Sequence, residues 1–139
     1  GHSLGAALAT LAADRFSHAA GAYTYGSPRV GNRKFRIQYR IQAYRIINNS
    51  DIVTKVPPRA YYRHVGEIRF IDEFGMVYER IPDEVKEEPK IQREPRDNYE
   101  TDELFRGGLQ GLVPDIARDH NPVLYTVHLW NNLVGGRHE

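Results

Sequence analysis

The sequence predicts an α/β fold with a mostly parallel sheet flanked by helices, and three observations support this prediction. Residues 1–5 have the pattern G-x-S-x-G and run directly into an alanine-rich segment, as in a tight turn from a strand into a helix. Two short apolar segments, 21–25 and 43–47, are typical of buried strands. Residues 33–42 between them have helical character, and a strand–helix–strand unit implies parallel strands with helices on the sheet faces.

The composition is that of one ordinary domain. The chain has 139 residues, of which 40% are hydrophobic, so we expect one domain over 1–139 with a single core. The net charge of +1, with basic and acidic residues interspersed, gives no indication of a nucleic-acid partner. The lack of cysteine excludes a disulfide framework and a thiolate metal site, and it favours a reducing compartment. No apolar run is long enough to cross a membrane, so no transmembrane segment is expected.

The first half of the chain alternates between helices and strands. A helix is expected over 5–16, with its apolar face marked by Leu8, Leu11, Ala12 and Phe16. Strand 21–25 follows, and Asn32 then caps a helix over 33–42, whose partial apolar side consists of Phe35, Tyr39 and Ile41. Strand 43–47 leads into a loop over 48–58 at its C-terminal end.

The middle of the chain is less regular. Residues 66–71 and 76–80 predict a β-hairpin. At about 82–101 the chain is polar, with three prolines and dense mixed charge, so we expect a solvated, flexible excursion. Residues 102–118 have helical character, although glycine and proline interrupt it.

A final helix is expected from Pro122 to about residue 133, capped by Asn121 and ended by glycines 135–136. One face of this helix carries the apolar residues Val123, Val127, Trp130 and Val134. His128 lies within the helix next to that face, so we interpret it as a packing or flanking residue.

The turn at residues 1–5 places Ser3 as a candidate nucleophile. Glycines two residues on either side allow a tight, strained turn that lifts the Ser3 hydroxyl clear of the sheet, and we expect a side chain at Gly1 or Gly5 to collide with the neighbouring backbone. The amide of Leu4 at the start of the helix is then positioned to stabilise an oxyanion. A chance Gly/Ser-rich turn is the alternative, and the helix that follows at once favours the catalytic interpretation.

A nucleophilic serine needs a base and an orienting acid, which follow in the order Ser, Asp, His on parallel-sheet hydrolases. Asp51 lies in the loop after the strand 43–47, although an aspartate there also suits an Asx turn that bonds its own backbone. His120 lies in a loop just before the final helix, where the alternative is a solvated side chain. The three residues occur in the required order, each at the boundary of an element.

Several blocks together resemble the class 3 lipase family, the fungal-type triacylglycerol lipases and their plant and bacterial relatives. These blocks are GHSLGAALA at 1–9, YGSPRVGN at 25–32, RIINNSDIV at 45–53 and VPP at 56–58. The stretch from Asp119 and His120 to Tyr125 and Val127 is similar to the block that holds the family's catalytic histidine, and YRHVG at 62–66 matches a weaker one.

The resemblance implies the C-terminal portion of an α/β-hydrolase fold that starts at the nucleophile turn. In that interpretation the N-terminal strands, the second oxyanion donor, the lid and any targeting segment lie upstream. Ser3 would be the nucleophile, Asp51 the orienting acid, His120 the base and Leu4 one oxyanion amide. The expected function is hydrolysis of carboxylic esters of lipids through an acyl-enzyme. The expected partner is a lipid or ester substrate at a lipid–water interface.

The expected substrate-binding residues are apolar side chains that follow Asp51 and His120. They are Ile52, Val53, Val56, Pro57, Val123 and Leu124, all of which could equally belong to the core. No cofactor is expected, and no metal, because His2, His18 and His64 lack the spacing of a ligand set. Two other functions stay open: a truncated or non-catalytic lipase-like module, and an esterase or acyltransferase that acts on non-triglyceride esters.

Overall fold

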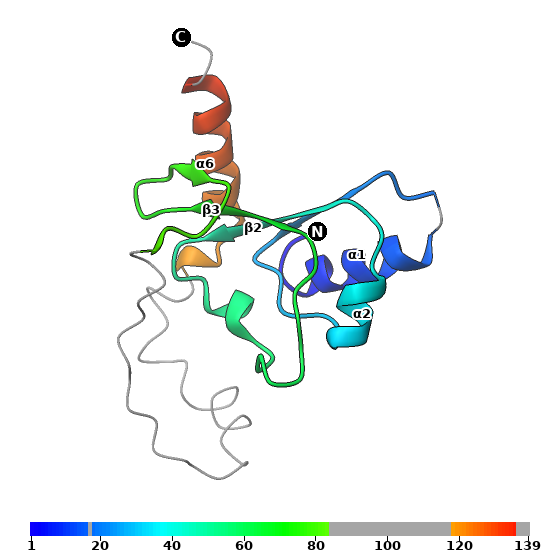
Figure 1. Cartoon of the computed structure of the whole chain (residues 1–139). Coiled ribbons are helices and arrows are strands. Elements are labelled where there is room, and N and C mark those ends of the chain that lie inside the picture. Colours follow the sequence, from blue (N-terminus) through cyan, green and yellow to red (C-terminus); the bar gives the residue numbers. More distant parts are fainter. Residues whose placement is uncertain (17, 84–117, 136–139) are drawn as a thin grey trace, which may run out of the picture.

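The computed structural model describes residues 1–16, 18–83 and 118–135 (Figure 1). Within these residues one sheet has the strand order β1-β2-β3-β4. Its strands are β1 Ala22–Tyr25, β2 Ala43–Asn48, β3 Glu67–Ile71 and β4 Val77–Tyr78. The helices are α1 Leu4–Arg15, α2 Arg33–Gln38 and α6 Pro122–Gly135, with a 3₁₀ turn, η1, at Ile52–Lys55. The predicted α/β fold class, with a mostly parallel sheet flanked by helices, is confirmed.

The sheet is parallel from β1 to β3 and becomes antiparallel only at β4. Residues 1–3 run alongside β1, because the Tyr25 amide donates to the Gly1 carbonyl at 2.9 Å and the Ser3 amide donates to the Tyr25 carbonyl at 3.0 Å. The carboxyl ends of parallel strands meet at one edge of a sheet. The turn after residue 2, the end of β1 and the end of β2 therefore lie together.

Helices α1 and α6 cover opposite faces of the sheet (Figure 1). On one face Ala13 of α1 packs with Ala22 and Ala43. On the other face Tyr125 of α6 packs with Ile46 and Ile71. Successive side chains of a strand point to opposite faces, which is why β2 supplies residues to both clusters.

The prediction of which face of the first helix is buried is wrong. Leu8, Leu11 and Phe16 are exposed, whereas Ala6, Thr10 and Ala13 are buried. Small residues at helical spacing let α1 approach the sheet closely, and the Thr10 hydroxyl satisfies itself by donating to the Ala6 carbonyl at 2.9 Å. The helix therefore buries its small side chains and leaves its large ones outside.

The second helix is shorter than predicted, since it ends at Gln38 rather than residue 42. Tyr39 is extended and both it and Ile41 pack against the alanine cluster around Ala43. Tyr39 and Ile41 are separated by one residue, so their side chains point to the same side on extended backbone, whereas on a helix they would not. The predicted cap is present, because the Asn32 side chain accepts from the Phe35 amide at 2.9 Å.

The predicted hairpin is present in β3 and β4, and the Asp72 side chain accepts from the amides of Phe74 and Met76 in its turn. The final helix also begins as predicted, because the Asn121 side chain accepts from the Val123 amide at 2.9 Å. Its buried side differs from the predicted apolar face, which is exposed at Val123, Val127, Trp130 and Val134.

Two predictions, the flexible excursion beyond residue 83 and the interrupted helix up to residue 117, lie outside the described residues. No helix in the described part of the chain is both long and apolar enough to cross a membrane.

Ile71→Ala tests which apolar residues hold the sheet together. Ile71 is 0% exposed in the cluster with Tyr125, so its truncation leaves a cavity and should lower the free energy of unfolding by about 2–5 kcal/mol. Ile37→Ala on α2, where the side chain is 61% exposed, should cost less than about 1 kcal/mol. Urea titrations of the full-length protein compare the two, and equal losses would contradict the assigned core.

Candidate active site

Ser3 occupies the cap position of α1 in a strained backbone conformation. Its φ is 57° and its ψ is −129°, a region that residues other than glycine rarely adopt. The amides of Ala6 and Ala7 donate to its carbonyl, and its own amide donates to Tyr25 of the sheet. Hydrogen bonds on both sides therefore hold the conformation that raises the hydroxyl above the strand end.

The two glycines of the turn are not equivalent. A Cβ at Gly1 would lie 2.4 Å from the Gly5 carbonyl oxygen, so the predicted collision holds there. A Cβ at Gly5 would meet nothing within 4 Å, so the prediction is wrong at that position. Gly5 is exposed in the first turn of α1, whereas Gly1 lies beneath that turn against its backbone.

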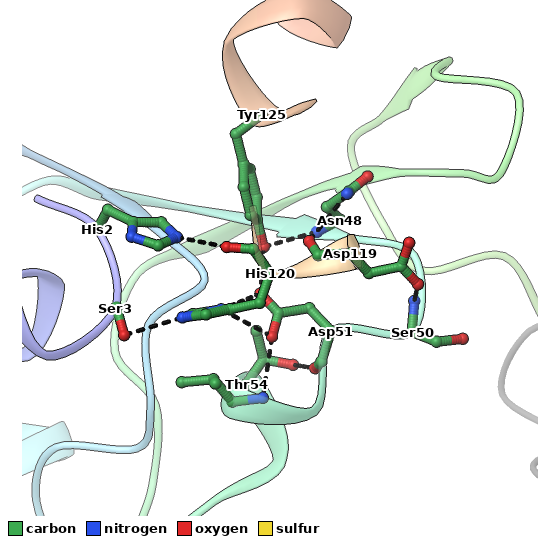
Figure 2. Close-up of polar contacts among 10 residues, drawn as sticks. His2, Ser3, Asn48, Ser50, Asp51, Thr54, Asp119, His120 and Tyr125 are labelled. Carbon is green, nitrogen blue, oxygen red and sulfur yellow. Dashed lines mark hydrogen bonds and ion pairs between the residues drawn. The ribbon is translucent and has the colours of Figure 1, made fainter. Parts of the chain in front are cut away.

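The structure brings Ser3, His120 and Asp51 together in one hydrogen-bonded chain (Figure 2). Ser3 Oγ lies 2.9 Å from His120 Nε2, and His120 Nδ1 lies 2.9 Å from Asp51 Oδ2 and 3.0 Å from Oδ1. The Asp51 side chain is 0% exposed and that of His120 is 20% exposed. A carboxylate only accepts hydrogen bonds, so Nδ1 carries the imidazole proton and Nε2 is free to accept from the serine hydroxyl.

The Asp51 carboxylate receives two further donors. The Val53 amide donates to Oδ1 at 2.9 Å and the Tyr125 hydroxyl donates to Oδ2 at 2.6 Å. The bond to Val53 is the Asx turn considered as the alternative for Asp51, and it caps η1. The two interpretations therefore coexist, because the carboxylate that caps the turn also faces His120.

Tyr125 is a site residue to which the sequence analysis assigned no role. It is buried as the fourth residue of α6, and besides donating to Asp51 its hydroxyl accepts from the Asn48 amide at 3.0 Å. Burial, followed by the negative charge of Asp51, raises the pKa of Tyr125, so its hydroxyl stays a donor. Its place in the first turn of the helix that follows His120 is the sequence signal that could have identified it.

Gly26, for which the sequence predicted no role of its own, makes room for the Asp51 and His120 side chains. Its φ is +57°, and a Cβ there would lie 2.7 Å from Asp51 Oδ2 and 2.9 Å from His120 Nδ1. Any larger residue after β1 would therefore separate Asp51 from His120.

The loop after β2 also holds the segment that precedes the helix α6. The Asn48 side chain donates to the Asp119 carbonyl at 2.9 Å, and the Ser50 amide donates to the Asp119 carboxylate at 3.2 Å. Asn49 adds a longer bond of 3.3 Å to the same carboxylate. These contacts fix the backbone immediately before His120.

Leu4 is the first residue of α1, so its amide has no carbonyl within the helix to bind and is available to an oxyanion. The six predicted substrate-binding residues are at least partly accessible. Ile52, Val56 and Val123 are exposed, and Val53, Pro57 and Leu124 are half-buried. Their role in binding stays a prediction.

An open depression of about 760 Å³ lies away from these residues, lined by Val30, Gly31, Asn32, Phe35, Tyr61 and Tyr62. It contains none of the three hydrogen-bonded residues, so we place the chemistry at Ser3 on the basis of the contacts rather than of this hollow. No group of three or more His, Asp or Glu side chains in the described ranges could hold a metal ion.

A family model and several known proteins are similar to part of this chain. The family model described as "Lipase (class 3)" matches residues 1–61, a range that includes Ser3 and Asp51. Over 81 residues the chain is 42% identical to "Secreted mono- and diacylglycerol lipase 1" of Fusarium solani. This match covers 52% of this chain and 24% of that protein.

Two further similarities cover part of the chain. The chain is 48% identical over 66 residues to "Phospholipase A(1) DAD1, chloroplastic" of Arabidopsis thaliana. This match covers 41% of this chain and 15% of that protein. A crystal structure of a lipase from Rhizopus microsporus var. chinensis matches with 36% identity and a TM-score of 0.45, over 51% of this chain and 29% of that one. The chain thus spans about a quarter or less of the two curated relatives.

Tyr125→Phe should destabilise the protein, because it removes a donor from a buried carboxylate and leaves the Asn48 amide without its acceptor. We expect the free energy of unfolding to fall by about 1.5–3 kcal/mol. Tyr61→Phe, at an exposed tyrosine, is the matched control and should change it by less than about 0.5 kcal/mol. Urea titration measures both, and similar values for the two variants would contradict this account of Tyr125.

His64 should make stability depend on pH. Burial, followed by the positive charge of Arg45, lowers the pKa of His64 to about 3, while its Nε2 lies 2.8 Å from the Thr54 carbonyl. The unfolded chain takes up a proton below about pH 6.5 where the folded protein does not, so this stability is complete above that pH and is lost as the pH falls.

His64→Gln keeps a donor for Thr54 but does not titrate. Between pH 7 and pH 5 the wild type should lose about 2 kcal/mol more stability than this variant. Urea titrations at the two pH values measure the difference, and parallel losses would show that His64 is protonated in the folded state.

Proposed function

Because the chain belongs to the class 3 lipase family, we propose that it carries the catalytic residues of a serine hydrolase that cleaves carboxylic esters of lipids. The observation that supports this most directly is the continuous chain from Ser3 Oγ through His120 to the buried Asp51 carboxylate. A hydroxyl, a base and an orienting acid in this order are what activates a serine for attack on a carbonyl. The strained, hydrogen-bonded conformation of Ser3 therefore supports a catalytic role over a non-catalytic module.

In the proposed reaction the Ser3 oxygen attacks the ester carbonyl carbon while its proton passes to His120 Nε2. Asp51, held by its other donors, keeps the imidazole oriented and stabilises the positive charge that forms on it. The carbonyl oxygen becomes an oxyanion near the Leu4 amide, where the N-terminus of α1 adds a favourable dipole. His120 then returns the proton to the departing alcohol, which leaves an acyl group on Ser3.

Deacylation uses the same residues in reverse roles. Water gives a proton to His120 and attacks the acyl carbon, and the imidazole then returns that proton to the Ser3 oxygen as the fatty acid leaves. The Ser3 backbone moves little in this cycle, because the sheet and the first turn of α1 both bind it. These hydrogen bonds hold the strained conformation and so keep the hydroxyl in place for each step.

We further propose that the substrate is an acyl ester of a glycerolipid. The two curated relatives are named as an acylglycerol lipase and a phospholipase A(1). The lipids in these two names both contain such an acyl ester and differ in the rest of the lipid. Partly accessible apolar side chains follow both the acid and the base, at Ile52 and Val56 and at Val123 and Leu124. Their chemistry suits an acyl chain, which supports the lipid over a small polar ester.

Fluorophosphonate labelling of the full-length protein tests the proposed roles, because this probe forms a covalent bond only with an activated serine. Ser3→Ala should remove labelling, and His120→Ala should reduce it by roughly 10⁴-fold or more, since the base is lost. His128→Ala is the matched control, because His128 lies in α6 outside the hydrogen-bonded chain. It should label normally and change the free energy of unfolding by at most about 1 kcal/mol.

Hydrolysis of p-nitrophenyl esters should follow the same order among the three variants. Normal labelling of the His120 variant with none of the His128 variant would reassign the base. Labelling that persists in the Ser3 variant would overturn the serine-hydrolase proposal.

A further inference from the structure

We infer that His2 is a positioning residue for the base, in that its ring N–H holds the main-chain carbonyl of His120 and so sets the distance from the imidazole to Ser3. His2 Nε2 lies 2.8 Å from the His120 carbonyl oxygen, although 118 positions separate the two residues. The inference rests on the proposed function, since it concerns how His120 reaches the nucleophile.

The backbone of His2 is itself fixed. It pairs with Tyr25 in a parallel bridge. On either side of it, the Gly1 carbonyl accepts from the Tyr25 amide and the Ser3 amide donates to the Tyr25 carbonyl. The residue that precedes the nucleophile is therefore bound to the edge of the sheet. Whatever its side chain holds is placed relative to the same strand that places Ser3.

Two adjacent carbonyls of the segment before α6 are bound from two directions (Figure 2). The Asp119 carbonyl accepts from Asn48, at the end of the strand that leads to Asp51. The His120 carbonyl accepts from His2, next to Ser3. The base is thus fastened once on the side of the acid and once on the side of the nucleophile, which fixes its position between them.

The ring of His2 also packs on the base. The centroids of the His2 and His120 rings are 4.5 Å apart with an interplanar angle of 33°, and the Tyr125 ring lies 5.9 Å away, edge-on. A carbonyl only accepts, so His2 Nε2 must carry the proton of this hydrogen bond.

Two substitutions of His2 separate its hydrogen bond from its packing, and a third substitution, at another histidine, is the control. His2→Phe keeps an aromatic ring against His120 but removes the donor. His2→Gln keeps a side-chain N–H that can reach the His120 carbonyl but removes the ring. His18→Gln is the control, because His18 is exposed in the turn after α1 and is absent from the proposed site.

We expect His2→Phe to reduce the rate constant of fluorophosphonate labelling and the kcat for a p-nitrophenyl ester by roughly 10- to 100-fold, the loss typical of a base displaced by about 1 Å. KM should change little, because substrate contacts are unaffected. His2→Gln should recover the rate to within about threefold of the wild type, and His18→Gln should match the wild type. A residue that served only packing would give the opposite order of Phe and Gln.

A spectroscopic readout does not depend on turnover. In ¹⁵N spectra of histidine-labelled wild type, His2 should be the Nε2-protonated tautomer. An Nδ1-protonated ring would overturn the inference, as would wild-type rates in His2→Phe or an equally slow His2→Gln. If His2→Phe does not fold, the Gln variant and the tautomer decide. Failure of the wild type to label would instead remove the proposed function, and this inference with it.

Discussion

The buried Asp51 carboxylate needs hydrogen-bond donors, and several parts of this structure supply them. An ionised carboxylate removed from water is strongly unfavourable unless donors replace its hydration. Its donors come from separate places: the Val53 amide in the next turn, the His120 ring before α6 and the Tyr125 hydroxyl within α6. The end of β2 and the start of α6 are therefore joined through one side chain. The contacts that stabilise the charge also orient the imidazole toward Ser3.

The close approach of these groups depends on unusual backbone at two positions. Ser3 has a positive φ that the neighbouring strand and the first turn of α1 hold in place. Gly26 also has a positive φ, and its missing Cβ leaves space for Asp51 and His120. Strain at such points is tolerated when surrounding hydrogen bonds determine the conformation, and here the sheet edge supplies them.

The sheet brings together residues that lie far apart in the chain. Parallel pairing of β1 with β2 places the turn at Ser3, the residue Gly26 and the loop of Asp51 at one edge. His120 reaches the same edge from the last part of the chain, where Asn48 binds the carbonyl of Asp119 and His2 binds the carbonyl of His120 itself. The turn at Ser3 thus binds the backbone of His120, and the end of β2 before Asp51 binds the backbone of the preceding residue, Asp119.

The sequence by itself determined the features that depend on neighbouring residues: the turn around Ser3, the strand–helix–strand unit, the caps at Asn32 and Asn121, and the order of the three candidate catalytic residues. Such features follow from local hydrogen bonds and side-chain periodicity, which a short window of sequence contains. Only the tertiary structure decided which side of α1 is buried and that Tyr125 and Gly26 belong to the site. Those outcomes depend on how closely a helix approaches the sheet and on contacts between segments more than 70 positions apart. Packing and strand register set these distances, which a short window of sequence does not predict.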